Sequence, residues 1–186
     1  MIVRRATLIV GAVFLATSAV ADDANPAAMA KAATGFYTAY RTFNPSDGIP
    51  DAKGRAKYEP FISPDLDALL KAGDAAETKF AAENKDSPPM VEGDLFTSNF
   101  EGATAFKIGA CTGDGKTGKC AVMLTYDPGK TNNPKDKPFS WTDSAYLVNT
   151  LQGWRVDDIG YGGTWDFGNK GRMKGTLKVV VHDAGN

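Results

Sequence analysis

Residues 139–159 have the sequence FSWTDSAYLVNTLQGWRVDDI, and this stretch decides the fold class. The runs Phe139 to Leu151 and Trp154 to Ile159 are rich in aromatic and β-branched residues, which favour β-strands. Gln152-Gly153 separates them, and a short glycine-containing connection between two such runs predicts a β-hairpin. We therefore expect two adjacent antiparallel strands in the second half of the chain.

Another hairpin is expected directly upstream. Ala103 to Cys111 and Lys119 to Tyr126 are two strand-like runs on either side of a glycine-rich turn. Residues 127–138 (DPGKTNNPKDKP) then hold three prolines, which exclude a central strand and predict a long loop between the two hairpins.

The turn of this upstream hairpin, ACTGDGKT at 110–117, comes close to the phosphate-binding pattern G-x-x-x-x-G-K-[ST]. Ala110 stands where the pattern has its first glycine, and a strand follows instead of the helix whose N-terminus would face a phosphate. Asp114-Gly115 is a common turn pair of hairpins, so we interpret the stretch as a turn.

Cys111 and Cys120 flank the same turn. Two cysteines of one hairpin usually pair in an oxidising compartment, so we expect a disulfide between them. The alternation of side chains along the strands conflicts with this pairing. If Ile108 faces the core, Cys111 in the same strand faces away from it, whereas Val122 facing the core places Cys120 toward the core as well. Either a β-bulge interrupts the ladder or one run is buried on both faces.

Two helical segments precede the strands. The first begins at Pro26, and its apolar residues recur at steps of three and four, as on one helix face: Met29, Ala33, Phe36, Tyr40 and Phe43. The second begins at Ser63-Pro64-Asp65, where serine is a good N-cap and proline fits the first helical position. Its apolar stripe consists of Leu66, Leu69, Leu70 and Gly73, with Phe80 further on.

The C-terminal segment is ambiguous. Val179-Val180-Val181 favours a strand by propensity, whereas Met173, Leu177 and Val180 fit a helix by spacing, and we favour the helix. Helices followed by antiparallel strands predict an α+β fold with the helices packed on one face of a curved sheet. With 20 glycines and 10 prolines among 186 residues, a helical bundle or coiled coil is excluded.

The N-terminus resembles an export signal. Basic residues up to Arg5 precede the apolar run 6–16, and Ala19-Val20-Ala21 matches the small-x-small pattern of signal peptidase sites. We therefore expect a signal peptide over residues 1–21, cleavage after Ala21, and a single α+β domain over 22–186 in the periplasm or outside the cell. No later segment is apolar enough to span a membrane.

Four motifs, taken in their order along the chain, carry a resemblance. They are the aromatic first helix, the S-P-D-L-D-A-L-L stretch at 63–70, G-D-L-F at 93–96 and G-W-R-V-D-D-I at 153–159. Together they resemble a family of exported bacterial proteins of unknown function. Its fold is similar to the cone-shaped domains of nuclear transport factor 2 and ketosteroid isomerase, and the resemblance implies this fold and compartment but no activity.

Aromatic residues are the first candidates for ligand binding. In a cone-shaped fold the helices cover the concave face of the sheet, so rings there would either line a pocket or fill the core. We favour core packing and retain five candidates for a pocket: Tyr37, Tyr40, Trp141, Tyr146 and Trp154.

Asp157 and Asp158 are the candidates for catalysis. Neighbours in a strand point to opposite faces, so only one of them would enter a cavity. A carboxylate buried there among aromatic rings would have a raised pKa and would serve as a general base, as in isomerases of this superfold. The competing interpretation, which we favour, is an exposed acidic strand end.

Composition narrows the function further. A net charge of −1 gives no electrostatic footprint for nucleic acid, and one histidine with two cysteines argues against a metal site. We expect no cofactor. The sequence favours non-catalytic binding of a small apolar ligand or of a cell-envelope protein. The alternatives are an isomerase or hydratase that uses a cavity Asp, and an inhibitor or immunity protein for a cell-envelope enzyme.

Overall fold

Among the described residues, helices precede four consecutive strands, and one further helix follows the strands. The computed structural model describes residues 25–42, 48–131 and 136–185, so the expected signal peptide and Phe43 lie outside the described residues. The elements are α1 (Pro26–Tyr40), α2 (Ala52–Arg55), the 3₁₀ helix η2 (Glu59–Phe61), α3 (Pro64–Glu83), β1 (Ala105–Gly113), β2 (Thr117–Tyr126), β3 (Phe139–Thr150), β4 (Gly153–Gly160) and α4 (Met173–Asp183).

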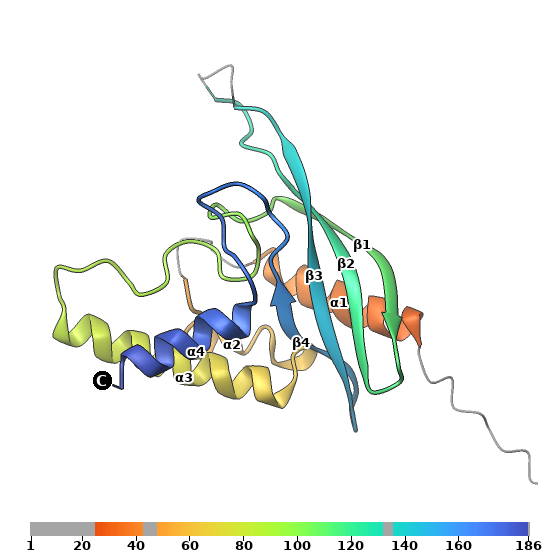
Figure 1. Ribbon diagram of the computed structural model, residues 1–186, viewed down its shortest axis with the longest axis horizontal. Helices are drawn as coiled ribbons and strands as arrows, with labels where there is room; N and C mark the ends of the chain where they lie inside the picture. The colour runs from red at the N-terminus through yellow and green to blue at the C-terminus, as the bar shows by residue number, and fades with distance from the viewer. Residues whose placement is uncertain (1–24, 43–47, 132–135, 186) are drawn as a thin grey trace, which may run out of the picture.

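The four strands form one antiparallel sheet in the order β1-β2-β3-β4. Helix α1 crosses one face of this sheet, while α3 and α4 lie together beside β4 (Figure 1). The residues before α3 run along the free edge of β4, where the Ser63 N–H donates to the Val156 carbonyl at 2.8 Å. The α+β class is therefore confirmed. Among the described helices, α1 covers the sheet face, and α3 and α4 lie beside the edge strand β4.

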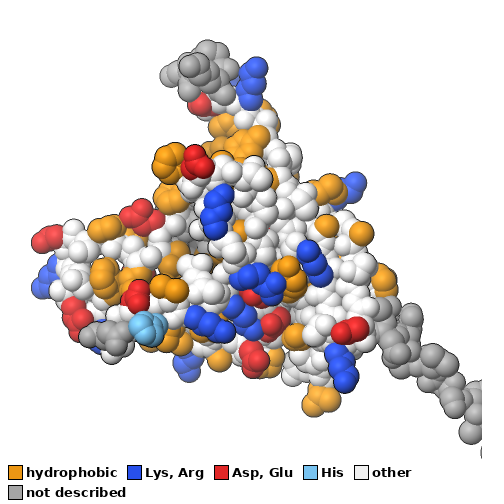
Figure 2. Space-filling view, viewed as in Figure 1, with side chains coloured by type: hydrophobic (Ala, Val, Ile, Leu, Met, Phe, Trp, Pro, Cys, Tyr) orange, Lys and Arg blue, Asp and Glu red, His pale blue; other side chains and the backbone are white. Residues whose placement is uncertain are grey.

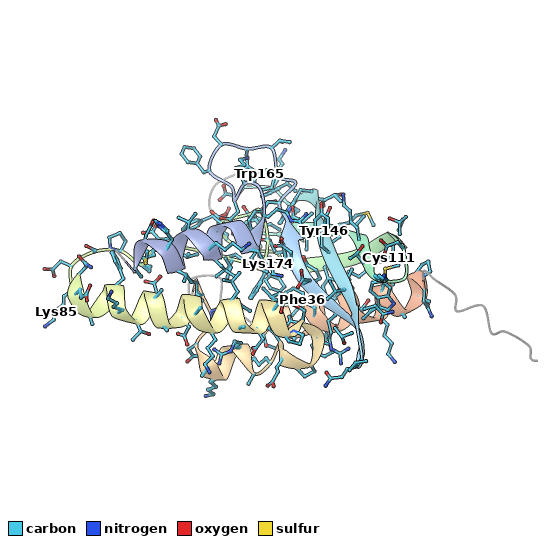
Figure 3. All side chains as sticks on the ribbon, turned by 60° about the horizontal axis from the view of Figure 1, so that its bottom comes forward. Phe36, Lys85, Cys111, Tyr146, Trp165 and Lys174 are labelled. Atoms are coloured by element: carbon cyan, nitrogen blue, oxygen red, sulfur yellow. A yellow bond between two sulfur atoms is a disulfide. The ribbon has the colours of Figure 1, made fainter. Side chains whose placement is uncertain are left out.

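The core lies between α1 and the sheet. Phe36 of α1, labelled in Figure 3, is fully buried, and its ring centroid lies 5.5 Å from that of Tyr58 and 5.3 Å from that of Phe96. The strands contribute buried side chains at alternate positions: Cys120, Val122, Leu124, Trp141, Ala145, Leu147, Trp154 and Val156. Large side chains thus fill the space that an open cone would leave for a ligand.

Helix α3 begins as the sequence predicts. The Ser63 hydroxyl accepts a hydrogen bond from the Leu66 N–H at 3.0 Å, and Pro64 occupies the first helical position. Gly73 allows a close approach to α4, because a Cβ there would lie 3.1 Å from the Leu177 Cδ2 atom. The C-terminal segment is a helix, and Met173, Leu177 and Val180 form its buried face.

A bulge in the β1–β2 hairpin resolves the conflict between strand alternation and the disulfide. Ile108 pairs with Val122 and Cys111 with Cys120, so β1 takes one residue more than β2 between these pairs. The extra residue reverses the parity of β1, which brings both sulfurs to the same side. The Cys111–Cys120 disulfide is thus confirmed, with the two Cα atoms 4.1 Å apart.

Residues 127–131 and 136–138 form no helix or strand, in agreement with the expected loop, and 132–135 lie outside the described residues. Within the part of the chain that the structure describes, no helix is long and apolar enough to cross a lipid bilayer.

Candidate functional site

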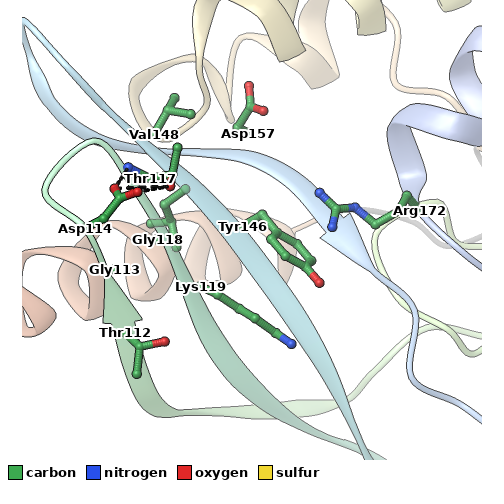
Figure 4. A pocket seen from close by; sticks show the side chains of 11 residues that line it. Thr112, Gly113, Asp114, Thr117, Gly118, Lys119, Tyr146, Val148, Asp157 and Arg172 are labelled. Atoms are coloured by element: carbon green, nitrogen blue, oxygen red, sulfur yellow. Dashed lines mark hydrogen bonds between the residues drawn. The ribbon is translucent and has the colours of Figure 1, made fainter. Parts of the chain in front are cut away.

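A shallow groove of about 390 Å³ lies on the sheet face opposite α1 (Figure 4). Lys119 of β2 and Tyr146 of β3 are directly paired in the ladder. They face the groove because their neighbours Cys120 and Ala145 are buried on the other face. The β1–β2 turn and Arg172, which directly precedes α4, complete the walls.

Two cations approach the Tyr146 ring. The Arg172 guanidinium carbon lies 3.4 Å from the ring centroid, and the Lys119 ammonium lies 5.4 Å from it. Figure 4 shows these side chains reaching toward Tyr146 from different elements. The electron-rich face of an aromatic ring attracts cations, so the ring helps to hold both charges at the groove.

The position of Arg172 is fixed by its backbone and by one carboxylate. Its backbone bridges to Gly160 at the end of β4, and its Nε donates to Asp158 at 2.8 Å. Within the described residues the terminal guanidinium nitrogens have no carboxylate partner, and neither does Lys119. Both side chains therefore offer N–H groups toward the open groove.

Asp157 and Asp158 lie beside the start of α4. Tyr146 pairs with Asp158 and Leu147 with Val156, so Asp157 is an extra residue that bulges from β4. Because of this bulge, the two neighbouring carboxylates do not simply alternate between opposite faces, as the sequence analysis assumed. Both of them reach the first turn of α4.

The contacts of the two carboxylates are ionic and specific. Asp157 accepts from the Ser63 hydroxyl at 2.5 Å and from the Lys174 ammonium at 2.7 Å. Asp158, which is 5% exposed, accepts from the Lys174 N–H at 2.9 Å in addition to Arg172. A carboxylate at this place satisfies a free N–H and complements the helix dipole. The favoured interpretation as an exposed acidic strand end is therefore wrong.

Asp114 closes the β1–β2 turn at the rim of the groove. Its carboxylate accepts from the N–H groups of Thr117 and Lys116 at 2.7 and 2.9 Å, and these hydrogen bonds lower the pKa of Asp114. A phosphate bound by the loop would need such N–H groups. The carboxylate occupies them instead, and Gly115 adopts a φ of 85°, so the stretch 110–117 is a hairpin turn.

The five aromatic candidates lie in different places. Tyr37 and Tyr40 are buried on α1, and Trp141 and Trp154 are buried on the sheet face toward the core. Of the five, Tyr146 lines the groove of Figure 4. The structure brings it together with Asp157, Lys119 and Arg172, two of which the sequence analysis did not single out as site residues.

A buried polar cluster was also missed. Asp94 is 1% exposed; its carboxylate accepts from the Tyr40 hydroxyl and, at 2.5 and 3.1 Å, from the N–H groups of Phe96 and Thr97. Burial raises the pKa of Asp94 to about 7, and it also raises the pKa of Tyr40. An Asp that accepts from N–H groups two and three residues ahead is a recognisable turn signal.

A second buried carboxylate holds the same loop from the sheet. Asp143 of β3 is fully buried and accepts from the N–H of Ser98 at 2.8 Å, from the Trp141 indole at 3.1 Å and from the N–H of Gly162 at 2.8 Å. Residues 94–99 are thus tied to α1 and to β3, and we assign both carboxylates a structural role.

Figure 2 shows Lys and Arg side chains gathered where the start of α4 meets the strands. In the groove, Lys119 and Arg172 combine an open position with N–H groups directed to the solvent. Guanidinium and ammonium groups bind carboxylates and phosphates, and Arg does so with two parallel hydrogen bonds. The groove is therefore equipped to bind an anionic group.

Comparisons of the chain with protein-family models, with curated proteins and with solved structures found no match.

Proposed function

We propose that the chain is an exported, non-catalytic binding protein of the cell envelope, and that its groove binds a carboxylate-bearing segment of a partner protein. The observation that carries this proposal is the pair Lys119 and Arg172, whose charges meet at Tyr146 in an open groove. An open groove with two cationic side chains at its wall suits an extended acidic protein segment better than a small uncharged ligand.

The contacts of the carboxylates argue against the enzymatic alternative. An isomerase or hydratase needs a carboxylate that is free to exchange a proton with a substrate. Asp157 and Asp158 are instead committed to Lys174 and Arg172, and the core between α1 and the sheet is filled by aromatic side chains. A binding role needs neither a free base nor an internal cavity.

The proposal includes the fold family and the compartment. Helices followed by consecutive antiparallel strands are compatible with the cone-shaped fold of nuclear transport factor 2, to which the sequence motifs point. The Cys111–Cys120 disulfide suits an oxidising compartment such as the periplasm or the cell exterior. The proposed signal peptide over residues 1–21 would deliver the chain there.

A defined acidic peptide tests the groove. We would titrate the protein with fluorescein-labelled octaglutamate and follow anisotropy at low and at physiological salt, with octalysine as the charge control. Lys119→Gln should weaken octaglutamate binding about threefold to tenfold, since one charged hydrogen bond contributes about 1 kcal/mol or more. Higher salt should weaken the binding of the wild type.

Lys85→Gln is the matched control, because Lys85 is an exposed lysine at the end of α3, far from the groove (Figure 3). Arg172→Lys keeps the charge and removes the planar fork, so it should fall between the wild type and Lys119→Gln. The proposal fails if octaglutamate binds Lys119→Gln and Lys85→Gln equally well, or if octalysine binds as tightly as octaglutamate.

A further inference from the structure

A second cleft, of about 550 Å³, lies where α1 meets the β3–β4 turn and η2. Ala28, Ala32 and Gly35 line it from α1, Phe61 lines it from η2, and Trp154 lines it from the start of β4. It shares no lining residue with the groove of Figure 4. The two sites are therefore independent.

The walls of this cleft are apolar because α1 presents small side chains there. A Cβ at Gly35 would lie 2.4 Å from the Phe61 Cε1 atom, so the phenyl ring lies directly on the glycine backbone. Ala28, Ala32 and Gly35 follow one another at steps of four and three residues, so they lie on the same side of α1. The side chains of Ala28 and Ala32 are too short to fill the remaining space of the cleft. A volume of this size falls within the ~300–1,000 Å³ range of small-molecule sites.

The charged groups at this cleft are both cationic, and the uncharged Thr34 and Gln152 line it beside them. Lys31 and Arg155 line it, and no acidic residue does. The Arg155 Nη1 donates to the Trp154 carbonyl at 3.0 Å, which keeps the guanidinium close to the cleft. Among the residues that the structure describes, neither cation forms an ion pair. Two unneutralised positive charges beside an apolar trough are complementary to a molecule with one negative end and a hydrocarbon body.

We propose that this cleft binds a medium-chain fatty acid, with the alkyl chain against Ala28, Ala32 and Phe61 and the carboxylate between Lys31 and Arg155. Each methylene that the cleft removes from water adds to the affinity, so the alkyl chain supplies most of it. The two cations supply the preference for an anionic head group, since a cationic head would meet only like charges. This site goes beyond the acidic protein segment that we propose for the groove.

Titration calorimetry with dodecanoate below its micellar concentration tests the site. Dodecanoate should bind the wild-type protein with a 1:1 stoichiometry, while dodecyltrimethylammonium should bind at least about tenfold more weakly because the charge is reversed. Ala32→Leu places a larger side chain in the cleft and should abolish dodecanoate binding. Ala28→Leu provides a second filling variant if Ala32→Leu melts at a lower temperature than the wild type.

The matched control for the filling variants is Ala27→Leu, because Ala27 is exposed on α1 and does not line the cleft. The double variant Lys31→Gln/Arg155→Gln should lose about tenfold in dodecanoate affinity, the size expected for two charged contacts near the surface. The pair Lys71→Gln/Lys85→Gln removes the same charge from α3 and from the turn after it, and it should bind as the wild type does.

Three results would overturn the proposal. The first is that dodecanoate does not bind the wild type. The second is that dodecanoate binds Ala32→Leu and Ala27→Leu equally well when both variants are folded. The third is that the wild type binds dodecanoate and dodecyltrimethylammonium with equal affinity. Binding of an acidic amphipathic peptide without binding of dodecanoate would assign the cleft to a protein partner and also overturn it. Because Lys119→Gln changes the groove alone and Ala32→Leu changes the cleft alone, failure at one site is distinguishable from failure at the other.

Discussion

Replacing Asp94 by asparagine should change how the stability of the protein depends on pH. The Asp94 carboxyl is buried under the loop 94–99, where the Tyr40 hydroxyl and two backbone N–H groups reach it. Burial disfavours its charge more than these hydrogen bonds favour it, so the pKa of Asp94 rises from 3.8 to about 7. Asparagine has the shape of the protonated form and cannot acquire the charge.

The size and sign of the effect follow from linkage. A pKa about three above that of the unfolded chain means that the folded protein binds this proton more tightly by about 4 kcal/mol. That stabilisation is fully present below pH 3.8 and is lost as the pH rises through 7. Relative to Asp94→Asn, the wild type should therefore lose up to about 4 kcal/mol of unfolding free energy between pH 4 and pH 8.

Urea unfolding followed by tryptophan fluorescence, repeated at half-unit steps of pH, measures this difference. Other carboxyl groups titrate in both proteins, so their contributions cancel in the comparison. Asp166→Asn is the control, because Asp166 is exposed, and it should follow the wild type at every pH. The reasoning is refuted if the difference between wild type and Asp94→Asn is independent of pH, or if the wild type gains on the variant as the pH rises.

Three further changes probe the disulfide, the core and the cap of α4. Replacing both Cys111 and Cys120 by serine should lower the unfolding free energy by about 2.5–3 kcal/mol for a loop of this length, and adding reductant to the wild type should reproduce the loss. Trp154→Ala should cost about 3–5 kcal/mol because its ring is 6% exposed, and an unchanged melting temperature would contradict this. Asp158→Ala should lower the unfolding free energy by about 1–2 kcal/mol, because it removes the carboxylate that caps α4 and pairs with Arg172. A loss below about 0.5 kcal/mol in urea unfolding would show that Asp158 does not stabilise the fold.

Local patterns predicted the parts of the fold that depend on neighbouring residues. The spacing in α1, the Ser63 cap of α3, both hairpins and the disulfide each rest on residues close together in the sequence. The short helices α2 and η2 were not predicted, because four and three residues are too few for a periodic pattern.

The site was harder to predict because its parts come from distant segments. Arg172 contacts Tyr146 because the segment after β4 folds back against the end of that strand. No residue spacing in the sequence predicts this contact. Simple alternation also failed at Asp157 and Asp158, since a single extra residue changes which face each side chain meets. The two aspartates therefore required the register of β3 and β4, which only the folded sheet defines.

Because α4 follows the sheet along the chain, the order of synthesis has a consequence for folding. Leu177 packs on Gly73, and Lys174 in the first turn of α4 pairs its ammonium with Asp157 and donates its N–H to Asp158. A chain that emerges N-terminus first leaves this side of α3 uncovered until α4 has been made. A product that stops before Met173 would keep the four described strands yet expose an apolar face of α3 and leave Asp157 without the Lys174 ammonium. Such a fragment would be a substrate for quality-control proteases, so chains that lack α4 would be removed while chains that carry it persist.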